Sequence, residues 1–190
     1  MNLKEIINKR RAYRSLESVE ITEELVKDLA ECAHLAPSCF NNQPWRFVFV
    51  YDKAMLEKLR TALSKGNAWA QLASMIIAVF SRKDFDCVTK EREYYLFDTG
   101  MTTAFIILRA TELGLVAHPI AGYSEEKVKE ILGIPNEMRV INLVIVGRHS
   151  ENLNPVLSER QIEWERNRPD RLPLEKFAYK NMYKESEIWT

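Results

Sequence analysis

The spacing of apolar residues predicts alternating helices and strands up to about residue 150. Apolar side chains recur every three or four positions from Leu3 and again from Leu25, which is typical of helices with one buried face. The segments RFVFVYD from Arg46 and SMIIAVFS from Ser74 are strand-like. The second has too few polar positions to face water on either side, so we expect it at the centre of a sheet.

Further elements continue this alternation. A helix is expected from Lys53, another after the cap residue Ser124, and a second buried strand from Val140. The longest predicted helix runs from Arg92 to Leu113, and its apolar residues are Phe97, Met101, Ala104, Phe105 and Leu108. These cover more than one helical face, which exceeds the need of a single core. The pattern therefore predicts helices on both sides of a sheet.

Composition indicates one ordinary globular domain over residues 1–190. The 27 basic and 27 acidic side chains cancel, so no overall field would attract nucleic acid or anionic lipid. Arg109 and Glu112 interrupt the best apolar stretch, which argues against a membrane span. Residues 150–190 are polar and contain spaced prolines, which favours a C-terminal arm.

The cysteines are expected to be ordinary thiols. Cys32, Cys39 and Cys87 are odd in number and lack the close paired spacing of a redox motif or a zinc site. We therefore expect no metal site and a reducing compartment, which indicates a soluble cytoplasmic protein.

Two polar segments interrupt this regular pattern. In RRAYR, Arg10 falls three and four residues after the apolar Ile7 and Ile6, so helical spacing places it on the apolar face, where a guanidinium needs an anion. An Arg that extends to solvent from a helix end is the alternative. In APSCFNNQPW, Ala36 to Trp45, amides between prolines could read the polar edge of a uracil-like ring, although an ordinary turn is again the alternative.

Together these segments resemble the motifs RRS(I/V)R and APSxxNxQPW of the nitroreductase family. DTGMTTAFIILRATELGL, HPIAGY, VKEILGIP and RLPLEKF extend the similarity in the family's order over most of the chain. The resemblance implies an α+β fold with three α/β/α layers, a central mixed sheet and an intertwined homodimer. It also implies FMN at each interface between subunits, with the arm reaching the partner subunit.

The resemblance implies cofactor contacts in four segments: Arg10, Arg11, Ala12 and Arg14; Pro37, Ser38, Cys39, Asn41 and Gln43; Pro119, Ile120, Ala121 and Gly122; and Arg171. Arg168 is an alternative to Arg171. The loop from Pro37 to Gln43 would act in part on the partner's flavin, and Phe40 within it would line the substrate pocket or fill the dimer core. The HPIAGY segment also fits a simple turn between helices.

The implied function is two-electron transfer from NADH or NADPH to an electron-poor small molecule, such as a nitroaromatic or a quinone. The flavin would carry the ping-pong hydride chemistry, so no catalytic side chain is expected. A specialised member, such as a reductive dehalogenase, an enone reductase or a flavin-fragmenting enzyme, is one alternative. A non-enzymatic protein that stores or senses FMN is another.

Overall fold

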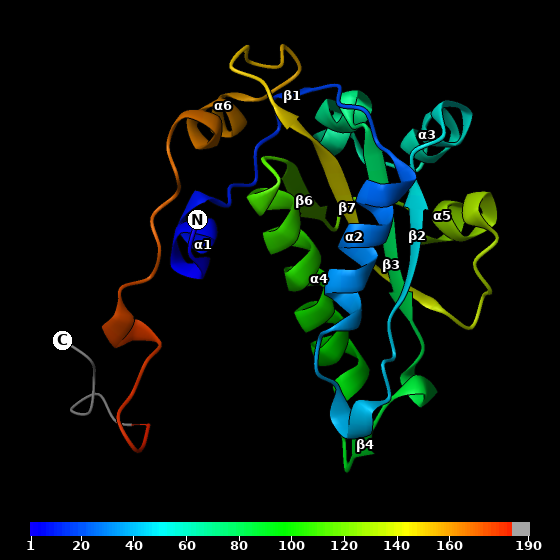
Figure 1. Cartoon of the computed structure of the whole chain (residues 1–190), viewed down its shortest axis with the longest axis vertical. Helices are drawn as coiled ribbons and strands as arrows, with labels where there is room; N and C mark the ends of the chain where they lie inside the picture. The colour runs from blue at the N-terminus through cyan, green and yellow to red at the C-terminus, as the bar shows by residue number, and fades with distance from the viewer. Residues whose placement is uncertain (184–190) are drawn as a thin grey trace.

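A five-stranded antiparallel sheet forms the centre of the computed structural model, which describes residues 1–183 (Figure 1). Its order is β1-β7-β3-β2, and β6 also pairs with β7. The strands are β1 (Leu16–Glu17), β2 (Arg46–Val50), β3 (Met75–Ser81), β6 (Val116–Ile120) and β7 (Arg139–His149). Within residues 1–183 every pair in this sheet is antiparallel, and no parallel pair occurs.

Helices cover both faces of the sheet. One face carries α2 (Glu23–His34) and α4 (Tyr94–Glu112), and the other carries α3 (Lys53–Arg60) and α5 (Glu125–Leu132). Helices α1 (Leu3–Lys9) and α6 (Glu159–Arg166) lie outside these layers, on the α4 side. Short 3-10 helices span Cys39–Asn41, Lys65–Leu72, Lys83–Phe85 and Leu174–Lys176, and β4 (Val88–Thr89) forms a small hairpin with β5 (Arg92–Glu93).

Strand β3 separates two apolar cores because its side chains alternate between the faces of the sheet. Met75 and Ile77 pack in the core that contains residues of α2 and α4. Ile76 and Ala78 pack in the core that contains residues of α3 and α5. All seven residues of β3 are buried, which confirms its predicted central place. The expected α+β fold with helical layers on both faces of a sheet is therefore confirmed.

Strand β6 was missed by the sequence pattern. Its five residues include His118 and Pro119, which break the apolar run that marked β3 and β7. Proline cannot donate a ladder hydrogen bond, so it is tolerated mainly in edge strands. Strand β6 pairs only with β7, in agreement with this rule.

Helix α4 turns polar residues toward the interior of its own chain. Asp98, Thr99, Thr102 and Thr103 are buried, and Thr102 Oγ1 donates to the carbonyl of Ala33 at 2.7 Å. The predicted apolar residues lie mainly on the other side: Phe97 is 63% exposed and Phe105 is 37% exposed. The second apolar face of this helix therefore remains uncovered in the single chain.

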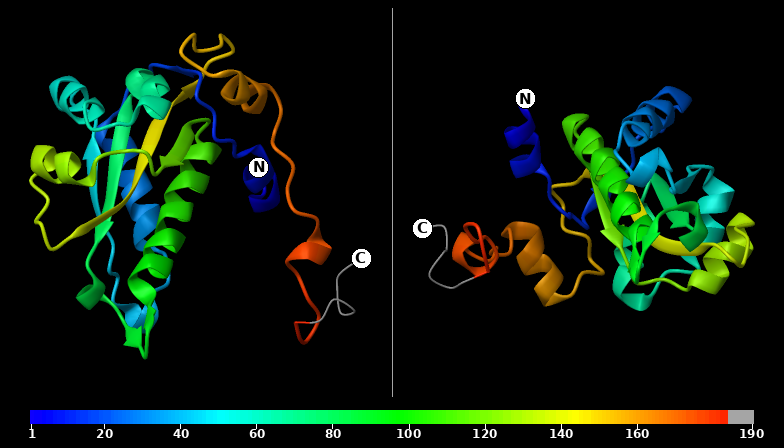
Figure 2. Two further views of the ribbon diagram at one scale, coloured as in Figure 1. Left: turned by 180° about the vertical axis from the view of Figure 1, so that it is seen from behind. Right: turned by 90° about the horizontal axis from the view of Figure 1, so that it is seen from below.

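The C-terminal arm lies with α1 on the α4 side of the molecule, opposite α5 (Figures 1 and 2). It contains α6, which the sequence pattern missed and which begins with a capping box between Ser158 and Gln161. The end of the predicted arm, residues 184–190, lies outside the described residues. None of the helices within residues 1–183 is long and apolar enough to cross a membrane.

The prediction of three ordinary thiols is wrong for two of them. Cys39 and Cys87 form a disulfide across 48 positions of sequence, and Cys32 remains free. Spacing rules detect cysteines that are close in sequence, whereas here the fold brings two distant loops together. The prediction of a reducing, cytoplasmic location therefore loses the support that it drew from the cysteines.

Candidate functional site

The arginine-rich segment begins where α1 ends. The helix stops at Lys9, and Arg10 is its C-cap, with φ −56° and ψ 123° outside the helical region. The expectation that Arg10 continues the apolar face of the helix is therefore wrong. Ile7 on that face is itself 49% exposed, so the apolar spacing here does not mark a core of the single chain.

Residues from both ends of the chain form one cationic pocket, which we call the arginine pocket. It has a volume of about 170 Å³ and is lined by Arg10, Arg11, Ala12, Arg14, Trp164, Arg168, Pro169 and Arg171. Within the described part of the chain, no acidic residue lines it. Arg168 and Arg171, which the sequence offered as alternatives, both take part. The four predicted residues of the N-terminal segment also meet here.

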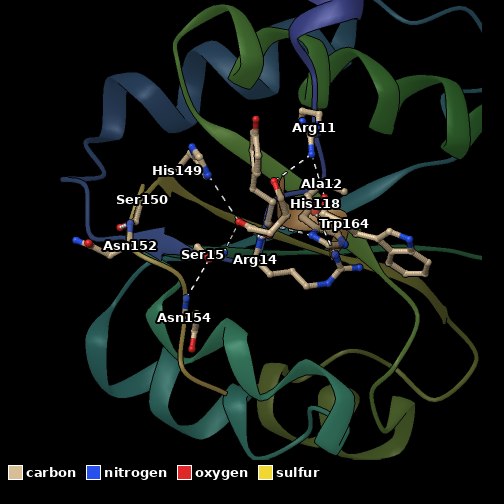
Figure 3. Close-up of polar contacts among 12 residues, drawn as sticks. Arg11, Ala12, Arg14, Ser15, His118, His149, Ser150, Asn152, Asn154 and Trp164 are labelled. Atoms are coloured by element: carbon tan, nitrogen blue, oxygen red, sulfur yellow. Dashed lines mark hydrogen bonds and ion pairs between the residues drawn. The ribbon is translucent and has the colours of Figure 1, made fainter. Parts of the chain in front are cut away.

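Glu165 fastens the arm to the N-terminal segment. Its buried carboxylate accepts hydrogen bonds from the backbone N–H groups of Arg14 and Ser15, each at 2.9 Å. The Arg11 guanidinium donates to the carbonyl of Trp164 at 2.9 Å (Figure 3). Glu165 therefore satisfies backbone donors and leaves the arginine side chains of the pocket without a carboxylate among its lining residues.

Aromatic rings and backbone carbonyls orient the arginines. The Arg14 guanidinium lies 5.9 Å from the Trp69 ring centroid and 5.6 Å from that of Trp164. Arg168 donates to the carbonyl of Arg10 at 2.8 Å and also to that of Asn8. Stacking and fixed hydrogen bonds limit the rotamers of these side chains before any ligand arrives.

The pocket is electrostatically incomplete. Burial lowers the pKa of Arg10, and the positive charges of Arg168, Arg171 and Arg11 lower it further. Partial burial also lowers the pKa of Arg14, although the negative charge of Glu165 opposes this shift. Crowded guanidinium groups that destabilise one another's charge favour a bound anion, and their forked donors match phosphate or carboxylate oxygens. The geometry and charge of the pocket therefore fit a phosphate group.

His118, in β6, packs beside the arginine-rich segment. Its ring stacks on Trp69 with centroids 4.7 Å apart, and its Nδ1 lies 3.0 Å from the carbonyl oxygen of Tyr13, which requires Nδ1–H to donate. Burial lowers the pKa of His118 to about 4, and the charges of Arg14 and Arg10 add to this effect. The neutral ring thus serves a structural role, as a donor and a stacking surface.

The HPIAGY segment occupies the end of β6 and the following turn. Pro119 is exposed, but the side chain of Ile120 is buried in the core. Ala121 is exposed beyond the strand. At Gly122 an added Cβ would lie 2.5 Å from Ser64 Oγ, so tight packing is one physical reason for glycine at this position. Any ligand contact at Ile120 would therefore come from its backbone.

The predicted loop Pro37–Gln43 lies at the opposite end of α4 from the arginine pocket. Cys39 N–H donates to the buried carboxylate of Asp98, near the start of α4, at 2.7 Å. Arg11 adjoins Thr111 and Gly114 at the other end of that helix. The 13 residues from Asp98 to Thr111 correspond to about 20 Å of helix. One chain therefore does not bring the two predicted groups together.

The loop itself has an unusual backbone. Phe40, Asn41 and Gln43 adopt left-handed conformations, with φ values of 47°, 58° and 49°. For residues other than glycine such conformations cost about 1–3 kcal/mol each, and they cluster at functional sites. The Phe40 side chain is 93% exposed. The loop therefore holds an apolar ring in solvent at some conformational cost.

Several residues of the site had no signal in the sequence. Tyr13 stacks on His149 with ring centroids 3.7 Å apart, and Trp164 and Glu165 belong to the missed helix α6. Their contacts join positions more than 130 residues apart. The Glu-Trp-Glu run of α6 resembles a solvated helix in one dimension, so only the fold reveals that Glu165 is buried.

The depressed pKa of His118 predicts a pH dependence of stability. The unfolded imidazole binds a proton below about pH 6.5, whereas the folded ring stays neutral down to about pH 4. The free energy of unfolding should therefore fall by about 3 kcal/mol as the pH drops through this window. Urea denaturation of wild type and His118→Phe across pH 4–7 should give a smaller fall in the variant. Equal falls would show that the ring is not held neutral.

Comparisons with known proteins identify the family of this chain. The model of the nitroreductase family matches residues 7–73 and 63–148. An Archaeoglobus fulgidus protein named for NADH dehydrogenase or NAD(P)H nitroreductase is 28% identical, over 90% of this chain and 97% of its own.

Solved structures share the fold. A crystal structure described as an oxidoreductase containing FMN has a TM-score of 0.82 and 27% identity, with 94% of this chain and 91% of that chain covered. A nitroreductase family protein from Clostridium novyi NT has a TM-score of 0.74 and 26% identity, over 80% and 87% of the two chains. With most of its length matched by the family model and its arginine pocket assembled from both ends, the chain belongs to the nitroreductase family.

Proposed function

We propose that the protein is an FMN-dependent oxidoreductase that transfers two electrons from NADH or NADPH to an electron-poor small molecule, such as a nitroaromatic or a quinone. The arginine pocket carries this proposal, because five guanidinium groups converge there without a lining carboxylate. The FMN-containing oxidoreductase of the same fold supports the choice of cofactor.

The residues of the pocket suit the phosphate end of FMN. Arg10 and Arg171 would bind phosphate oxygens, and Arg168 would hold the backbone of Arg10 in place through its hydrogen bond. Arg11 and Arg14 would bind phosphate or the pyrimidine edge of the ring. The backbone N–H of Ala12, which lines the same pocket, is a further candidate donor.

When bound, FMN supplies the redox chemistry, because it can accept a hydride from a nicotinamide and pass two electrons to a second substrate. The chain's own contribution is binding, orientation and charge. Preorganised guanidinium groups stabilise negative charge that develops on a ligand held beside them. No side-chain acid, base or nucleophile is required by this proposal.

We also propose a homodimer in which each flavin site combines the arginine pocket of one chain with the loop Pro37–Gln43 of its partner. Two observations support it. The loop and the arginine pocket of one chain lie at opposite ends of α4, about 20 Å apart, and α4 leaves an apolar face uncovered. An exposed patch of this kind is typical of an interface. The C-terminal arm would reach across to the partner.

The cofactor proposal predicts a yellow protein that binds about one FMN per chain and loses its colour when NADH or NADPH is added under nitrogen. Arg10→Ala should weaken FMN binding about ten- to a hundredfold, because a charge-assisted hydrogen bond contributes roughly 1.5–3 kcal/mol. The measurement is a titration of apoprotein followed by flavin fluorescence.

Arg160→Ala is the matched control. Arg160 stacks on Trp164 at 4.3 Å but does not line the pocket, so its loss should leave FMN affinity nearly unchanged. Equal affinity in the Arg10 variant and in wild type would place the phosphate elsewhere. Bound FMN that no nicotinamide reduces would favour a storage or sensing role.

The dimer proposal predicts a solution mass of twice the 22.2 kDa of one chain at low micromolar concentration. Phe105→Glu should shift light scattering toward the monomer, because an unpaired carboxylate would be buried in the interface. Leu72→Glu is the control, since Leu72 is 47% exposed in the 3-10 helix of the opposite layer. A wild-type mass of one chain would contradict the proposal.

The exposed ring of Phe40 leads to a prediction about which acceptors the protein reduces faster. We propose that its exposed ring lines the acceptor pocket of the partner, where it would stack on planar molecules and obstruct bulky ones. Phe40→Ser should keep FMN but change the ratio of kcat/KM for a small quinone and a larger nitroaromatic. An unchanged ratio with a weakened dimer would instead assign Phe40 to the dimer core.

A further inference from the structure

A disulfide lies directly in the loop that the proposed function assigns to FMN. Cys39 in this loop is joined to Cys87, which precedes the β4–β5 hairpin. Asp86 accepts from the N–H of Cys87 at 2.8 Å and from Asn42 Nδ2 at 3.2 Å. Asp98 accepts from the N–H of Cys39 at 2.7 Å. The bridge therefore connects two segments that buried carboxylates hold at each end.

The bridge constrains a loop whose backbone is otherwise disfavoured. The left-handed residues Phe40, Asn41 and Gln43 follow Cys39 within four positions. Asn42, between them, reaches across to Asp86 and lies 3.4 Å from Cys87 Sγ. Conformations of this kind persist only where surrounding contacts hold them, and the disulfide is the covalent one among those contacts.

We propose that Cys39 and Cys87 form a site of reversible thiol oxidation that controls FMN binding: the disulfide holds the loop in its binding conformation, and the dithiol releases it. This inference rests on the proposed function, because it takes the loop to be a flavin contact. FMN binding would be controlled by whether the loop is covalently attached through the disulfide, and this control needs no metal or further ligand.

In the single chain, the Cys39 side of the bridge borders an open pocket. Cys39 lines an open pocket of about 370 Å³ together with Pro37, Ser38 and Phe97, and both cysteines are half-buried. Cys32, in α2, does not line this pocket and remains a free thiol, so it serves as an internal control for the two bridged cysteines.

The redox step is balanced with a hydroperoxide as oxidant. The Cys39 thiol first loses its proton to solvent, the thiolate attacks one oxygen of hydrogen peroxide, and the O–O bond breaks to give a sulfenic acid and hydroxide, which takes up a proton from solvent to form water. The Cys87 thiol then attacks the sulfenic sulfur, the S–S bond forms, and a second water leaves. The two sulfurs lose two electrons in total, and the peroxide gains them. An external dithiol reverses the reaction by thiol–disulfide exchange.

The acidic surroundings favour the uncharged disulfide over a pair of thiolates. Asp86 and Asp98 are both buried; burial raises the pKa of Asp98, the hydrogen bond from the N–H of Cys39 opposes this, and Asp86 raises the pKa further. Nearby carboxylates likewise disfavour a thiolate. Cys39, Asp86 and Cys87 place potential metal-ligand atoms within 4.8 Å of one another, but sulfurs joined in a disulfide are not available as thiolate ligands.

The first test is alkylation of the full chain, unfolded without reductant after exposure to hydrogen peroxide, followed by peptide mass spectrometry. We expect iodoacetamide to label Cys32 alone, and to label all three cysteines after treatment with dithiothreitol. Free Cys39 and Cys87 in the peroxide-treated protein would overturn the proposal. So would a divalent metal held by these thiols in native mass spectrometry.

The second test compares oxidised and reduced protein by hydrogen exchange and FMN titration. Reduction should accelerate exchange of amides in residues 36–45, leave β3 protected, and weaken FMN binding about tenfold if about one tenth of the reduced molecules keep the binding conformation. Cys87→Ser should show the reduced behaviour under all conditions, because Cys87 is not a predicted cofactor contact. Cys32→Ser should respond as wild type does.

The two proposals fail in different ways. Equal FMN affinity and equal loop exchange in both redox states would overturn the thiol control and leave the cofactor assignment intact. Absence of FMN binding in both states would contradict the cofactor assignment, and with it the control of FMN binding that rests on it. Loop exchange that still changes in that case would show only that the disulfide constrains residues 36–45.

Discussion

The site depends on one contact, the buried carboxylate of Glu165 on the backbone N–H groups of Arg14 and Ser15. It joins the start of the chain to the arm that follows the last strand of the sheet. Together with the hydrogen bonds of Arg168 to the carbonyls of Asn8 and Arg10, and of Arg11 to that of Trp164, this contact holds Arg168 and Arg171 beside Arg10. The carboxylate binds backbone donors and does not line the pocket, although its charge still acts on Arg14.

Helix α4 separates its polar side chains from its large apolar ones. Two of its threonines satisfy their hydroxyl groups on backbone carbonyls of their own chain, Thr102 on Ala33 and Thr103 on Thr99. Its phenylalanines are left outside. Helix α4 packs on its own chain through its threonines and through Ile106 and Ala110, and it offers its phenylalanines to a second surface. The proposed dimer would give that surface a partner and bring the loop Pro37–Gln43 to the second arginine pocket.

Much of the fold could be predicted from local pattern. Strand β3 is continuously apolar, and the caps Thr22 and Ser124 stand where the pattern places them. Strand β6 could not be predicted in this way, because His118 and Pro119 interrupt its apolar run. Helix α6 could not be predicted either, because the burial of Glu165 depends on a contact across 151 positions of sequence.

In the candidate site, too, local features could be predicted from the sequence and long-range contacts could not. RRAYR showed cationic crowding in the sequence, but its helical phase misplaced Arg10, since the helix ends one residue earlier. The pairing of Cys39 with Cys87 depends on two loops that only the tertiary structure brings together. Short-range chemistry was therefore visible in the sequence, whereas the partners of each group required the fold.

If each flavin site takes its arginine pocket from one chain and its loop from the other, heterodimers with one altered residue in each chain will reveal the sharing. One chain would carry Arg10→Ala and a second, differently tagged chain would carry Asn41→Ala. If sites are shared, one site of the heterodimer receives both defects and the other receives none, so each heterodimer should hold one FMN with wild-type affinity. If each chain forms its own site, both sites are defective, and the absence of a wild-type site in the purified heterodimer would contradict the account.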